Sequence, residues 1–102
     1  MKNIIEKAPK VANAFWNLTK EITEVYEGDL KNKELVLVGM FAVSGMFSGL
    51  ETHIQRAVKE GASEDEIVST ILLGIPVVGI CRINQAINIA MNIIKGENDE
   101  NN

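Results

Sequence analysis

The chain has 102 residues, of which 46% are hydrophobic and 24% are charged, a balance typical of one globular domain rather than a disordered chain. The net charge of −4 leaves no basic surface for nucleic acid, and aromatic residues, at 5%, are too few for a base-stacking platform. One cysteine cannot build a disulfide framework, and the opening "MKNIIEKAPK" lacks the apolar segment of a signal peptide, so we expect a cytoplasmic protein.

The first half of the chain predicts two helices. The first begins near Pro9, because proline is favoured in a first helical turn. Its apolar residues recur at steps of three and four and form one stripe, namely Val11, Phe15, Leu18, Ile22 and Val25. The second helix begins near Asn32 and is apolar on all sides, which is typical of a helix buried all round.

Two capping boxes predict the next two helix starts. Ser48 and Glu51 have the S-x-x-E spacing in which each side chain bonds the other residue's free amide, and Ser63 and Glu66 repeat it. Gly61 ends the helix between them.

The last predicted helix runs from about Val77 to Ile94, after a break near Gly74 and Pro76. Residues 96–102 are acidic and rich in asparagine, so we expect a disordered tail after a single domain at residues 1–95. The uncharged runs 35–50 and 71–81 are shorter than the roughly 18–20 residues of a membrane span. The pattern therefore predicts an all-α domain that does not enter a membrane.

The amount of apolar surface predicts self-association. A domain of this size buries only about two-thirds of its unfolded surface, yet the second helix is apolar all round and the last carries Val77, Val78 and Ile93 beside its main stripe. We expect a homo-oligomer that shares these helices rather than a monomer with scattered apolar residues.

The order of these signals, from "KNKEL" through the single histidine and its I-x-x-A to "EGASEDEI", resembles the carboxymuconolactone decarboxylase family, which includes alkylhydroperoxidase-D-like proteins. The resemblance covers about residues 30–90. It implies a bundle of five to six helices around an antiparallel helical pair, assembled as a trimer or hexamer. Proteins of this family are also commonly labelled as having peroxiredoxin activity.

The antioxidant branch of that family carries C-x-x-C-x-x-x-H, in which a helix start lowers the pKa of two thiols beside a histidine. Counting back from His53, the thiol positions are Gly49 and Met46. A peroxidase that depends on a cysteine pair is therefore not expected, and on this criterion the chain is closer to the decarboxylases.

The resemblance implies that His53 and Glu34 carry the chemistry. His53 lies on the apolar face of its predicted helix, where it is either a hydrogen-bonded core residue or a general acid or base. Glu34 lies in the first turn of the second helix, where the helix dipole alone would favour a carboxylate. The sharper hypothesis is that the two converge from neighbouring helices, so that Glu34 orients the imidazole and His53 moves a proton.

Arg82 interrupts an apolar run. It is either an ion-pair partner at an interface or a clamp for the carboxylate of a substrate. The adjacent Cys81 is expected to be a small buried residue. One histidine and no clustered carboxylates predict no metal site, and no cofactor is expected.

Three functions remain open. The first is cofactor-independent, lyase-type acid–base chemistry on a small carboxylated molecule. The second is antioxidant activity with Cys81 as a lone thiol. The third is a binding or assembly protein without catalysis.

Overall fold

The structure, a computed structural model, describes residues 1–101 and the side chains of residues 1–98. Its helices are α1 (Lys2–Lys7), α2 (Pro9–Val25), α3 (Leu30–Ser44), α4 (Phe47–Lys59), α5 (Glu64–Leu72), α6 (Ile75–Val78) and α7 (Ile80–Asn101). No strand occurs within these residues. The predicted all-α class and the start of a helix at Pro9 are confirmed, and the short helices α1 and α6 were not predicted.

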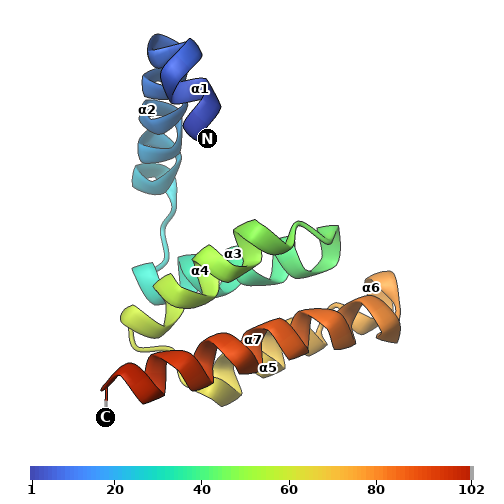
Figure 1. The fold of residues 1–102 in the computed structure, drawn as a ribbon. Helices are drawn as coiled ribbons and strands as arrows, with labels where there is room; N and C mark the ends of the chain where they lie inside the picture. The colour runs from blue at the N-terminus through green and yellow to red at the C-terminus, as the bar shows by residue number, and fades with distance from the viewer. Residues whose placement is uncertain (102) are drawn as a thin grey trace.

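Helices α3, α4, α5 and α7 form the body of the molecule. α3 packs on α4 and α5, and α7 packs on the same two helices. The pair α3 and α4 forms one layer and the pair α5 and α7 the other, and the two layers enclose one core (Figure 1). The fully buried side chains with the largest volumes lie between these layers: Val38, Leu50, Ile54, Ile67, Ile71 and Ile83.

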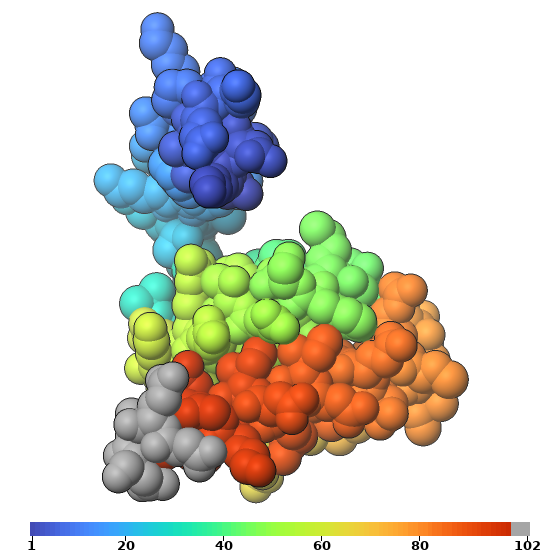
Figure 2. All heavy atoms as spheres, viewed as in Figure 1, coloured from blue at the N-terminus to red at the C-terminus, as the bar shows by residue number. Residues whose placement is uncertain are grey.

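Helices α1 and α2 form an arm (residues 2–25) that stands away from the body, as Figure 2 shows. Among the described elements, the extensive contacts of α1 and α2 are with each other. The radius of gyration is 14.7 Å, whereas a compact chain of this length measures about 13 Å. The apolar stripe predicted for this region is therefore exposed within the chain.

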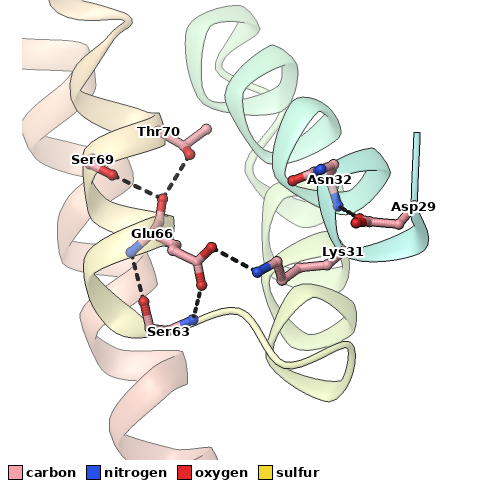
Figure 3. A network of polar contacts seen from close by, with 7 residues as sticks. All are labelled: Asp29, Lys31, Asn32, Ser63, Glu66, Ser69 and Thr70. Atoms are coloured by element: carbon pink, nitrogen blue, oxygen red, sulfur yellow. Dashed lines mark hydrogen bonds and ion pairs between the residues drawn. The ribbon is translucent and has the colours of Figure 1, made fainter. Parts of the chain in front are cut away.

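Polar side chains connect the starts of α3 and α5. Asp29 caps α3 by accepting a hydrogen bond of 2.7 Å from the amide of Asn32. Ser63 and Glu66 form the predicted capping box at the start of α5, with both bonds at 3.0 Å. Lys31 joins the two starts through an ion pair of 2.9 Å with Glu66 (Figure 3). The ion pair thus links the two layers at one end of the body.

Two expectations about the body need correction. One face of α3 is exposed, at Val36 and Met40, so this helix is not buried on all sides within one chain. The last helix continues beyond Ile94 to Asn101, so residues 96–101 of the predicted disordered tail are helical. Residue 102 lies outside the described residues. Within the described part, none of the helices combines the length and hydropathy that a bilayer span requires.

Candidate functional site

The antiparallel pair α3–α4 carries the two candidate catalytic residues. Gly45 ends α3 with a φ of 72°, a left-handed conformation that glycine adopts without steric cost. The chain then reverses, and α4 begins at Phe47. This short turn places the first half of α3 opposite the middle of α4, where Glu34 and His53 lie.

Glu34 and His53 are in direct contact. Nδ1 of His53 lies 2.6 Å from Oε2 of Glu34, although 19 residues separate them in the chain. The Glu34 side chain is 5% exposed and that of His53 15% exposed. The structure therefore brings together the two residues that the sequence singled out for proton transfer.

Lys33 completes the contacts of the carboxylate. Its ammonium lies 3.3 Å from Oε1 of Glu34, so each oxygen of this buried group has a partner of its own. A buried carboxylate needs such partners, because desolvation without them is costly. Lys33 was not predicted from the sequence, since neighbouring residues on a helix do not normally face one another.

The contact with Glu34 determines which nitrogen of His53 can react. A carboxylate only accepts hydrogen bonds, so Nδ1 carries the proton and donates it to Oε2. Within the described part of the chain, Nε2 has no hydrogen-bond partner, and no buried side-chain nitrogen or oxygen lacks one. Nε2 is therefore partly exposed and free to accept or donate a proton.

Phe41 holds the imidazole from the side. The two rings are stacked, with centroids 5.0 Å apart and planes 13° from parallel. A Cβ atom on Gly49 would clash with the ring of Phe41, so glycine at this position leaves room for the phenyl ring to reach His53. The period of α3 contained the signal for Phe41, because it follows Glu34 by seven residues and shares its face.

Arg82 is not brought to this pair within one chain. Its Nη1 donates a hydrogen bond of 3.1 Å to the carbonyl of Val43, nine residues or about 13 Å along α3 from Glu34. The guanidinium also lies over Gly45. In this position Arg82 caps the end of α3, and its role as a carboxylate clamp stays a prediction.

The predicted capping box at Ser48 and Glu51 is wrong. α4 begins one residue before Ser48, and the amide of Leu50 bonds the carbonyl of Met46 at 3.0 Å. Ser48 is therefore already inside the first turn, and its carbonyl accepts a bond from the hydroxyl of Thr52. The left-handed turn at Gly45 starts the new helix earlier than the serine signal indicates.

Two other side-chain observations bear on the open alternatives. Cys81 is exposed, not buried as predicted, because it lies on the outer side of the first turn of α7. Among the described residues, no three histidine, cysteine, aspartate or glutamate side chains form a group that would hold a metal ion.

The comparisons with known proteins agree with this architecture. The model of the carboxymuconolactone decarboxylase family matches residues 9–91, most of the chain. The chain belongs to the carboxymuconolactone decarboxylase family. None of the curated proteins matches it.

A solved structure of this family shows the same fold. It is the crystal structure of a candidate carboxymuconolactone decarboxylase from Burkholderia xenovorans LB400. The match has a TM-score of 0.77 and 26% sequence identity, and it covers 96% of this chain and 80% of that chain. The coverage includes most of the arm.

Within the family, Gly49 distinguishes this chain from the antioxidant pattern stated above. Gly49 stands at the position of the second thiol, and the Phe41 ring lies where a side chain on this residue would be. The histidine is kept, and its partners are a carboxylate and an aromatic ring.

Proposed function

We propose that this carboxymuconolactone decarboxylase family protein catalyses lyase-type acid–base chemistry on a small carboxylated molecule, with His53 as the proton-transfer residue. The observation that carries the proposal is the contact of 2.6 Å between Nδ1 of His53 and Oε2 of Glu34. A histidine oriented by a carboxylate, with its second nitrogen open, is a common arrangement for general acid–base catalysis.

The proposed reaction is the loss of CO2 from a carboxylated lactone. The bond between the ring carbon and the carboxylate breaks, and its electron pair moves into the adjoining unsaturated system. Protonated His53 then gives the proton on Nε2 to the carbon of that system on which the electron pair comes to rest and becomes neutral, so that R–COO⁻ and one proton yield R–H and CO2. Solvent returns the proton to Nε2.

The surrounding residues supply orientation in this scheme. Glu34 keeps the Nδ1 proton in place and stabilises the charged imidazolium, while the positive charge of Lys33 offsets the negative charge of the Glu34 carboxylate. Phe41 restricts rotation of the ring. The relative from Burkholderia, described as a candidate carboxymuconolactone decarboxylase, supports the choice of lactone acids as first substrates.

The test is CO2 release from a panel of carboxylated lactones. His53→Ala should lower the rate by about 10²- to 10⁴-fold, the usual contribution of a general acid or base, while circular dichroism remains that of the native fold. The matched control is Gln55→Ala, which removes an exposed side chain from the same helix. Unchanged CO2 release by His53→Ala would contradict the proposal.

The same assays separate the alternatives. Peroxide consumption that is lost in Cys81→Ser would favour antioxidant activity through the exposed thiol. A wild-type protein that releases no CO2, and whose melting temperature no lactone acid raises, would favour a non-catalytic role.

A further inference from the structure

The proton between Glu34 and His53 has two places to lie. Nδ1 of His53 and Oε2 of Glu34 are 2.6 Å apart, so the proton is bonded either to the nitrogen or to the oxygen. When one proton is added to the pair of carboxylate and neutral imidazole, the first arrangement is an imidazolium beside a carboxylate. The second is a neutral imidazole beside a carboxylic acid. Both carry a proton on Nε2, but only the imidazolium is a charged acid.

Burial favours the uncharged arrangement. The Glu34 side chain is 5% exposed and that of His53 15% exposed, and the ring of Phe41 covers one face of the imidazole. Removing charged groups from water is costly, and the attraction within a buried ion pair repays that cost only when further partners stabilise the charges. The carboxylate form of Glu34 therefore needs a partner besides His53.

Lys33 is that partner. Its Nζ lies 3.3 Å from Oε1 of Glu34, the oxygen that His53 does not contact. The lysine side chain is 21% exposed, and partial removal from water strengthens an ionic interaction that also weakens with distance. The ammonium therefore acts more strongly on the carboxylate that it contacts than on the imidazole bonded to the other oxygen.

The neighbouring lysine of the same helical turn does not share this position. Lys31 pairs with Glu66 of α5 instead (Figure 3). Among the described side chains, the ion-pair contacts of Glu34 are with Lys33 and His53. Lys31 thus joins α3 to α5, whereas Lys33 offsets the charge of Glu34.

We propose that Lys33 is a positioning residue that keeps Glu34 ionised and the shared proton on Nδ1 of His53. With Lys33 in place, the pair takes up a proton as an imidazolium, the form that protonates the substrate in the proposed reaction. Without the charge of Lys33, the same proton moves to Oε2 and leaves a neutral imidazole, which is a far weaker acid. The catalytic consequence rests on the proposed function, whereas the place of the proton does not.

Spectroscopy of the full chain locates the proton. The chain has one histidine, so 15N-labelled histidine reports on His53 alone. The carbonyl stretch of a carboxylic acid, assigned by its loss in Glu34→Gln, reports on Glu34. At a pH where the 15N shifts of the wild type are those of an imidazolium, we expect no acid band from Glu34. In Lys33→Met at the same pH, the acid band should appear and Nδ1 should lose its protonated shift.

Two variants control for charge, and a third for folding. Lys33→Arg keeps the positive charge and should restore the wild-type spectra. Lys31→Met removes one charge from the same helical turn, but that charge pairs with Glu66, so its spectra should match those of the wild type. If circular dichroism shows that Lys33→Met does not fold, Lys33→Gln replaces it, because glutamine also lacks the charge but keeps a polar end.

Three results would overturn the proposal. The first is an acid band of Glu34 in the wild type. The second is unchanged imidazolium shifts in Lys33→Met. The third is an equal change of the spectra in Lys31→Met, which would show a general effect of charge rather than the contact with Glu34.

CO2 release separates this inference from the proposed function. Lys33→Met should lower kcat several-fold with little change in KM, because Lys33 acts through Glu34, and Lys33→Arg should restore kcat. If the spectra change as expected but the wild type turns over no lactone acid, the placement of the proton stands and the proposed reaction fails. If the wild type is active and Lys33→Met keeps both its spectra and its kcat, Lys33 has no positioning role.

Discussion

The ring of Phe41 lies stacked on the imidazole of His53, with centroids 5.0 Å apart and planes 13° from parallel. Replacing it by leucine should lower the free energy of unfolding by about 1 kcal/mol, the usual worth of an aromatic pair. It should also let the imidazole leave the Nδ1–H tautomer, which imidazole 15N chemical shifts detect. The control is Phe47→Leu, which alters a half-buried ring packed against the core. Equal tautomer populations in both variants would show that Phe41 does not position His53.

Gly49→Ala should destabilise the protein although alanine is the better helix former. The new Cβ atom would clash with the Phe41 ring, and such overpacking costs about 1–3 kcal/mol. Urea unfolding measures the change. Gly96→Ala is the control, because nothing lies within 4 Å of its added Cβ, and it should stabilise α7 by up to about 1 kcal/mol. Adding Phe41→Leu to Gly49→Ala should recover part of the loss.

Glu34→Ala should lower the free energy of unfolding by about 1–3 kcal/mol, because it leaves the Nδ1–H donor of His53 without its acceptor. Glu34→Gln should cost less, since its amide oxygen still accepts. Lys33→Met is the comparison: it removes an ion pair of a partly exposed lysine, worth about 0–1 kcal/mol. A larger loss from Lys33→Met than from Glu34→Ala would contradict this ranking.

The capping box of α5 makes stability depend on pH. The pKa of Glu66 is lowered from 4.5, first by the hydrogen bond from the Ser63 amide and then by the bond from Lys31. Its stabilisation is therefore complete above pH 4.5 and is lost as the pH falls through the lower folded-state pKa. The unfolding free energies of Glu66→Gln and the wild type should converge in acid, with Glu64→Gln as the control.

The partner of Glu66 acts at the alkaline end. The pKa of Lys31 is raised from 10.5, chiefly by its hydrogen bond to Glu66. Its stabilisation is complete below pH 10.5 and is lost as the pH rises through the folded-state pKa.

At neutral pH, Ser63→Ala should lower the free energy of unfolding by about 1 kcal/mol by removing the cap itself, as urea unfolding would report.

The sequence was sufficient where a signal is local. Pro9 marked a helix start, and Ser63 with Glu66 marked another, because each depends only on residues within one turn. The contact between Glu34 and His53 was expected from the family resemblance, and periodicity placed each residue on its helix.

Prediction from the sequence failed where a helix boundary depends on the preceding turn, and where the burial of a side chain depends on tertiary packing or on surfaces outside the chain. Gly45 starts α4 before Ser48, so a correct capping pattern gave the wrong boundary. The stripe through Phe15 and Leu18 reads as a core face, and periodicity cannot tell whether its partner belongs to the same copy. Cys81 was assigned by its apolar neighbours, although its side of α7 is exposed.

The tight reversal at Gly45 also bears on how the protein folds. Glu34 and His53 are separated by 19 residues and lie on two consecutive helices, so bringing them together closes only a short loop of chain. Contacts of such short range form early and quickly. The α3–α4 hairpin should therefore assemble before α7 arrives to complete the core, and a chain still leaving the ribosome would already hold Glu34 and His53 side by side.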